Sequence, residues 1–138
     1  MAGSTHQATT PPEGVTGGPK LLLRLEGLAL AGAAVTLYAH SGFSWWLFAL
    51  LLLAPDLSFL GYLAGPRTGA AAYNAFHTTL APIALGLVSA PLDSPIALAI
   101  ALIWLAHIGL DRGLGYGLKY GAGFGFTHLG RVGKNAAG

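Results

Sequence analysis

The chain has 138 residues, of which 54% are hydrophobic and only 9% are charged. An ordinary soluble domain carries about 25% charged residues, so this composition excludes a soluble domain and predicts an integral membrane protein. The absence of cysteine excludes disulfides and thiolate metal sites. The few basic residues are scattered rather than clustered, so we expect them to contact anionic lipid headgroups and not nucleic acid.

The N-terminal residues 1–20 are polar and rich in Gly, Pro and Thr, a composition typical of a disordered tail. They lack the apolar run of a conventional signal peptide. The rest of the chain contains four apolar segments, each near the ~20 residues needed to cross ~30 Å of hydrocarbon. We expect transmembrane helices at 21–40, 45–64, 70–90 and 96–114.

Short connectors, "SGFS", "GPRTG" and "PLDSP", join these segments and make neighbouring helices antiparallel. Uninterrupted runs such as "LFALLLLA" lack the alternation of a membrane β-barrel. The sequence therefore predicts an all-α membrane domain over 21–118, built as an up-and-down bundle of four transmembrane helices. A glycine-rich C-terminal tail is expected over 119–138.

The distribution of Lys and Arg predicts the orientation of the bundle. All basic residues fall on the side shared by the two termini and the 65–69 loop, and the other two loops contain none. Both termini should therefore be cytoplasmic. Trp45 and Trp46 would then lie at the outer interface, and Tyr116 and Tyr120 at the inner one, as interfacial aromatic residues do.

Polar side chains within the predicted spans gather in the cytoplasmic half of the bilayer, at depths estimated from a rise of about 1.5 Å per residue. Ionisable groups there normally pair or line a cavity. We favour a layer of ion pairs that fixes helix register, and a functional pocket open to the cytoplasm is the alternative. The residues of this layer are Arg24, Glu26, Asp56, His77, His107, Asp111 and Arg112.

Asp56 follows Pro55, which cannot donate a backbone hydrogen bond and so predicts a bend with a free carbonyl beside the carboxylate. We expect an arginine from another helix to pair with Asp56, and a bound cation or proton is the alternative. His77 and His107 could ligate a metal, haem or chlorin. His107 and Asp111, four residues apart, share a helix face. A structural hydrogen bond within the bundle is the interpretation we favour for both histidines.

Three segments carry a family resemblance: "LLRLEGLAL", "SWWLFALLLLAPDLSFLGYLAGPRTGAAAYNAFH" and "IWLAHIGLDRGLGYGLKYGAGFGFTHLGR". Over roughly residues 21–133 the chain resembles a small bacterial membrane family, domain of unknown function 4260. The resemblance implies a four-helix, multi-pass protein of the bacterial inner membrane, cytoplasmic or intracytoplasmic, and supplies no activity. The matching motifs include most of the polar layer.

The function we expect is that of a non-catalytic accessory subunit in a larger membrane complex, with other integral membrane subunits and lipids as partners. A photosynthetic reaction centre with its antenna, or a respiratory complex, would be such a host. The N-terminal tail would fold on the partner and add contact area. The cofactor is unknown, and contact with a pigment or haem of the partner is one option.

Two other functions stay open. The first is an intramembrane enzyme that binds a metal or a lipid through the Asp, His and Arg side chains of the polar layer. The second is a small transporter, although the outer half of the bundle offers no polar path and the helix pairs show no obvious repeat.

Overall fold

The structure is a computed structural model that describes residue 10 and residues 12–133. Most of the predicted N-terminal tail and the last five residues lie outside this part of the chain. The helices are α1 (Gly17–Ala39), α2 (Trp45–Leu52), the 3₁₀ helix η1 (Ala54–Ala64), α3 (Pro66–His77), α4 (Leu80–Ser89) and α5 (Pro95–Leu114). A short antiparallel hairpin follows, formed by β1 (Phe126–Thr127) and β2 (Gly130–Arg131).

Three helical segments are long and apolar enough to cross a membrane: Gly17–Ala39, Trp45–Ala64 and Pro95–Leu114. They correspond to the first, second and fourth predicted spans and make the chain a helical membrane protein. The third predicted segment, 70–90, is divided between α3 and α4 and is not one continuous helix.

The helical segment Trp45–Ala64 changes from α to 3₁₀ geometry near Pro55. The ring of Pro55 has no N–H, and the N–H of Asp56 bonds to the Leu53 carbonyl at 3.0 Å, three residues back instead of four. The carbonyl of Leu52 therefore does not receive the hydrogen bond that an α-helix would give it. The bend predicted at Pro55 and Asp56 falls where the structure has this change of helix type.

A second break separates α3 from α4. Thr78 has extended backbone angles, φ −80° and ψ 143°, so α3 ends at His77. Helix α4 begins at Leu80, and Pro82 lies in its first turn, where the missing N–H costs nothing. The last carbonyls of α3 are consequently left without partners from their own helix.

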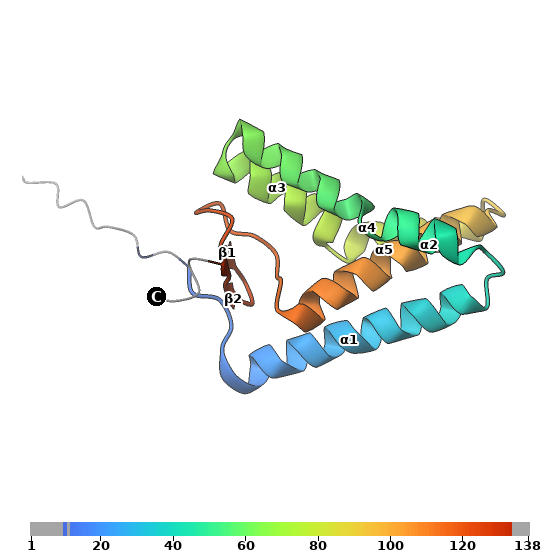
Figure 1. Ribbon diagram of the computed structural model, residues 1–138, viewed down its shortest axis with the longest axis horizontal. Helices are drawn as coiled ribbons and strands as arrows, with labels where there is room; N and C mark the ends of the chain where they lie inside the picture. The colour runs from blue at the N-terminus through green and yellow to red at the C-terminus, as the bar shows by residue number, and fades with distance from the viewer. Residues whose placement is uncertain (1–9, 11, 134–138) are drawn as a thin grey trace, which may run out of the picture.

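Helix α1 packs along α5 (Figure 1). The backbones approach closely because glycines face each other: a Cβ on Gly109 would lie 2.5 Å from the Gly27 carbonyl oxygen and 2.6 Å from the Ala31 nitrogen. Small residues allow such contact between membrane helices. Farther along the pair, towards the α2 end, a core of Ala34, Tyr38 and Ile103 is almost fully buried.

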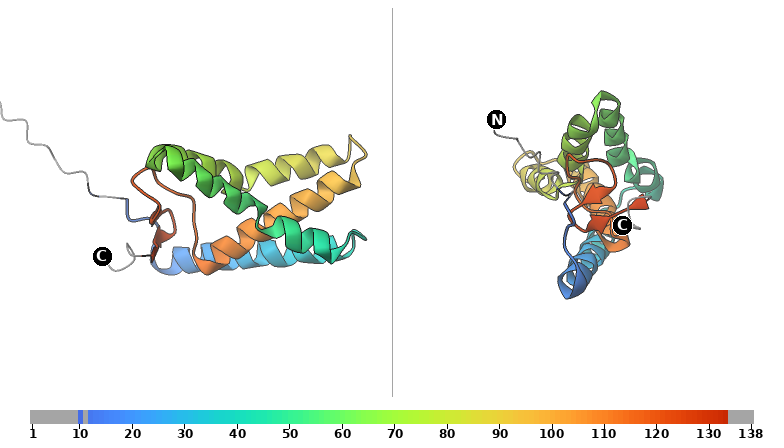
Figure 2. Two further views of the ribbon diagram at one scale, coloured as in Figure 1. Left: turned by 45° about the horizontal axis from the view of Figure 1, so that its top comes forward. Right: turned by 90° about the vertical axis from the view of Figure 1, so that its left-hand side faces the viewer.

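Residues 119–133, which the sequence led us to expect in a glycine-rich tail, fold back onto the end of the helices (Figure 2). Helix α5 ends at Leu114, and the left-handed conformation of Gly115 (φ +93°) turns the chain. The N–H of Val15 bonds to the His128 carbonyl at 2.7 Å, so the segment before α1 also contacts this return. Lys119, Thr127 and Leu129 are buried there.

The α1–α5 contact predicts opposite effects for two substitutions on one helix. Gly27→Ala should destabilise the protein by about 1–3 kcal/mol, because its methyl group would meet the Arg112 side chain and the Gly109 carbonyl. Gly32→Ala should be neutral or stabilising by up to about 1 kcal/mol, because nothing lies within 4 Å of its Cβ and alanine favours helix. Thermal unfolding in detergent, followed by circular dichroism, measures both, and equal midpoints would contradict the packing.

Candidate metal centre

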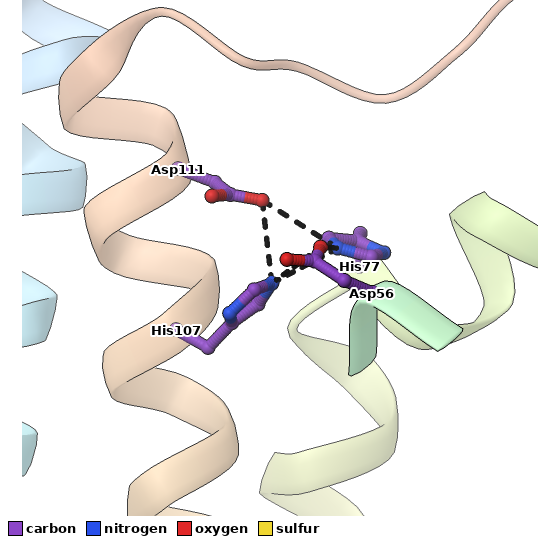
Figure 3. Close-up of side chains that lie close together, drawn as sticks. All are labelled: Asp56, His77, His107 and Asp111. Atoms are coloured by element: carbon purple, nitrogen blue, oxygen red, sulfur yellow. Dashed lines mark hydrogen bonds and ion pairs between the residues drawn. The ribbon is translucent and has the colours of Figure 1, made fainter. Parts of the chain in front are cut away.

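Four polar side chains converge where the two helix breaks face α5 (Figure 3). Asp56 comes from η1 and His77 is the last residue of α3, while His107 and Asp111 lie one turn apart on α5. We call these four residues the His–Asp cluster. All four belong to the polar layer predicted from depth, and the structure brings them into one site.

The cluster is compact, and one donor atom from each residue lies within 4.8 Å of the other three. The Asp56 carboxylate oxygen Oδ1 is 3.2 Å from the Nε2 atoms of both His77 and His107. Oδ2 of Asp111 is 3.5 and 3.4 Å from the same two nitrogens. The two Nε2 atoms are 3.0 Å apart. Each histidine nitrogen therefore faces both carboxylates and the other ring.

Backbone and ring contacts orient His77. Nδ1 of His77 lies 2.9 Å from the Tyr73 carbonyl, which can only accept, so Nδ1 carries a proton and, in the neutral ring, Nε2 presents a lone pair. The ring of His77 is also stacked on that of Tyr73, with 3.7 Å between centroids. Metal-ligating histidines are commonly oriented by backbone carbonyls.

Helix α5 holds the end of α3 in place on both sides of the cluster. Nε1 of Trp104 donates to the Phe76 carbonyl at 2.6 Å. Nη2 of Arg112 donates to the His77 carbonyl at 3.0 Å. These carbonyls have lost their helical partners at the break, and the α5 side chains satisfy them inside the protein. The backbone that carries His77 is therefore fixed relative to His107 and Asp111.

The two histidines are almost fully buried, with 2% of His77 and 4% of His107 exposed. The Asp56 and Asp111 side chains are more open, at 33% and 20%. Both carboxylates line a cavity of about 390 Å³ on the side of the C-terminal return. An ion held by the cluster would thus be shielded on the histidine side and approachable on the carboxylate side.

The prediction that an arginine pairs with Asp56 is wrong, because its carboxylate lies against two histidines, His77 and His107. Both arginines within the polar layer are engaged elsewhere. Nε of Arg24 donates to the Gly113 carbonyl at 2.9 Å. Nη1 of Arg112 lies 3.1 Å from His128, whose pKa is lowered by burial and then by the Arg112 charge.

The remaining predicted residues lie apart from the cluster. Glu26 is exposed on α1 and is not close to it. The predicted interface anchors Trp45, Trp46 and Tyr116 are exposed, and Tyr120 is half-buried.

Tyr73 and Lys119 were not among the residues predicted for the polar layer, although both reach the site. The Tyr73 hydroxyl donates to Oδ2 of Asp111 at 3.4 Å. Lys119 is only 4% exposed, and its ammonium lies 3.9 Å from the ring centroid of Phe124. Burial lowers the pKa of Lys119 to about 8, while Asp111 opposes that shift. Tyr73 lies one helical turn before His77 on α3, and this spacing could have placed it beside the histidine. Lys119 is brought to the site only by the fold of the chain after α5.

Comparisons with known proteins support the family and add no activity. No curated protein and no solved structure matches the chain. The family described as a domain of unknown function (DUF4260) matches residues 20–132, which include the whole His–Asp cluster and Lys119. The chain belongs to the DUF4260 family.

Proposed function

We propose that this protein is a membrane metalloprotein that holds one divalent transition-metal ion, Zn²⁺ being the best fit, in the His–Asp cluster. The observation that carries the proposal is the set of distances between donor atoms. Ligands arranged as a tetrahedron about 2.0–2.2 Å from Zn²⁺ are separated by about 3.3–3.6 Å. Five of the six separations in the cluster are between 3.0 and 3.5 Å.

The donor set supports zinc over the hard cations. Two imidazole nitrogens and two carboxylate oxygens suit Zn²⁺ or a neighbouring transition metal, whereas Mg²⁺ and Ca²⁺ prefer oxygen alone. Two carboxylates also balance the double positive charge of the ion. A site without net charge has the smallest desolvation free energy, which matters most where the surroundings are poorly hydrated.

An ion-pair network without metal is the competing interpretation of the same geometry. It requires protons on Nε2 of the histidines, since only imidazolium attracts a carboxylate as an ion. If both Nε2 atoms were protonated, two positively charged rings would face each other across 3.0 Å. If neither is protonated, four lone-pair donors converge and repel. With one proton, one Nε2 can donate to the other ring or to a carboxylate, so the network keeps a hydrogen bond while both carboxylates still face the same point. A bound cation would instead be shared by all four donor atoms.

Metal analysis tests the proposal. The purified protein should contain about one Zn²⁺ per chain after dialysis against the metal. His77→Ala and His107→Ala should each weaken zinc affinity by more than about 100-fold, beyond the 10–100-fold typical of losing an outer-shell partner. Affinity is measured by competition with a chromophoric chelator in detergent.

His40→Ala is the matched control, because His40 is exposed just after the C-terminal end of α1 and lies outside the cluster. Its ring bonds to the Thr36 carbonyl of that helix. It should bind zinc as the wild type does. Circular dichroism of each variant establishes that the helices persist. A folded wild-type protein that binds neither Zn²⁺ nor Fe²⁺, Mn²⁺ or Co²⁺ would refute the metal centre and leave the ion-pair network.

We further propose that the chain crosses the bacterial inner membrane four times, with α3 and α4 together forming one crossing and both termini in the cytoplasm. The distribution of basic residues supports this orientation. The breaks beside the cluster also suit an intramembrane site, since irregular backbone is tolerated there only when buried in protein. The cluster would then face the cytoplasmic side.

Single cysteines introduced into this cysteine-free chain test the orientation. Ser41→Cys and Asp93→Cys should react with an impermeant maleimide added to intact spheroplasts. Thr68→Cys should react only after the membrane is opened, because the start of α3 would be on the cytoplasmic side. Labelling of Thr68→Cys in intact spheroplasts would overturn the four-crossing arrangement.

A second candidate is the role of accessory subunit, with other membrane proteins as partners. One observation favours it: only 6% of the apolar stretch within Trp45–Ala64 is buried by the rest of the chain. Exposed leucines on this segment, among them Leu50, Leu57 and Leu63, offer a large apolar face to lipid or to another helix.

Mild detergent extraction from native membranes, followed by sizing, absorbance and mass spectrometry, tests the subunit role. We expect the chain to elute with stoichiometric partner subunits, and the spectrum would reveal any pigment or haem in that complex. Elution as a monomer or homodimer would remove this candidate without affecting the metal centre.

A further inference from the structure

The cavity beside the His–Asp cluster is lined by a buried lysine, Lys119, which forms no ion pair with the two aspartates of the cluster. It is lined by both carboxylates and by Lys119, with Tyr73, Phe59 and Phe124 among its walls. Lys119 is nine-tenths buried, and no carboxylate of the described residues forms an ion pair with it. Its ammonium rests against two aromatic rings, 3.9 Å from Phe124 and 4.9 Å from Tyr73.

The charges of the cavity do not cancel once the metal is counted. Two aspartates neutralise one divalent ion, and two neutral histidines add nothing. The ammonium of Lys119 then leaves one positive charge in a poorly hydrated space. Cation–π contacts of this kind offset only part of the cost of burying an ammonium. The cavity therefore favours a ligand with a single negative charge.

We propose that this cavity binds a monoanionic oxyanion attached to an apolar group, with the anionic head between the metal and Lys119 and the apolar part against Phe59 and Phe124. The head would be a carboxylate or a phosphodiester, and its source a membrane lipid or a small soluble acid. This inference rests on the proposed metal centre.

The position of Lys119 is fixed by Asn74, which supports a role for the ammonium in binding. Nδ2 of Asn74 donates to the Lys119 carbonyl at 2.8 Å, and the Lys119 N–H donates to Oδ1 of Asn74 at 2.6 Å. These two bonds join α3 to the C-terminal return beside the cavity. Asn74 is thus a positioning residue for Lys119.

Protein loaded with Co²⁺ in place of Zn²⁺ and held in phosphatidylcholine nanodiscs provides the test. Titrated octanoate should weaken the visible Co²⁺ bands as an oxygen enters the coordination shell. Nanodiscs containing phosphatidylglycerol should produce the change without octanoate if a lipid is the source. Lys119→Met should weaken anion binding at least about 10-fold, the order expected for losing one charge-assisted hydrogen bond, whereas Lys119→Arg should retain most of it.

Lys20→Met is the matched control, because Lys20 is half-buried near Gly130 and does not line the cavity. It should bind the anion as the wild type does. Asn74→Ala should weaken anion binding while metal content is unchanged. Circular dichroism and thermal unfolding of Lys119→Met beside the wild type establish that the variant is folded, so that a loss of binding is separated from unfolding.

Metal content is measured in every sample, which separates the two proposals. If cobalt is bound and neither octanoate nor phosphatidylglycerol changes the spectrum, the anion site is refuted and the metal centre stands. Equal anion affinity in Lys119→Met and wild type would also refute the site. If no metal is bound, the proposed function itself fails, and this inference fails with it.

Discussion

Four polar side chains facing one point within a membrane protein impose a constraint that the surrounding structure must meet. Unpaired charges are costly where water is scarce, so each donor atom needs a counter-charge or a proton in a defined place. The Tyr73 carbonyl determines that Nδ1 of His77 carries a proton, which leaves Nε2 of that ring to face the carboxylates. The arrangement of breaks, carbonyls and α5 side chains around the cluster follows from that requirement.

The helix breaks explain why arginine does not pair with aspartate here. Each break releases carbonyl groups that must find donors inside the protein. Arg112 supplies one such donor to the His77 carbonyl, and Trp104 another to that of Phe76. Arg24 similarly donates to Gly113 at the end of α5. The guanidinium groups thus serve backbone acceptors, which leaves the carboxylates to the histidines.

Hydropathy and helical rise, both local properties of the sequence, were enough to predict three of the four helical segments as long enough to cross a membrane and to group the polar residues in one layer. They also placed Asp56, His77, His107 and Asp111 at one level. The pairing of these residues was not predictable, since an arginine and a histidine at the same depth are equally suitable partners for a carboxylate. Only the packing of η1 and α3 against α5 decides between them.

The break after His77 left a weak signal in the sequence. Thr78 and Thr79 followed by Pro82 match the start of a new helix, but a continuous apolar run hides that start in a membrane segment. The burial of Lys119 left none. It depends on the return of the chain after Gly115 and on two hydrogen bonds to Asn74, contacts between residues 45 positions apart.

The 3₁₀ geometry of η1 affects the thickness of bilayer that this helical segment can span. A 3₁₀ helix rises about 2.0 Å per residue against about 1.5 Å in an α-helix. The 11 residues of η1 therefore cover about 22 Å instead of about 16 Å. Joined to α2, the segment reaches roughly 5 Å farther than a plain α-helix of equal length. It can match a thicker hydrocarbon layer, or lie at a steeper tilt in an ordinary one, without additional residues.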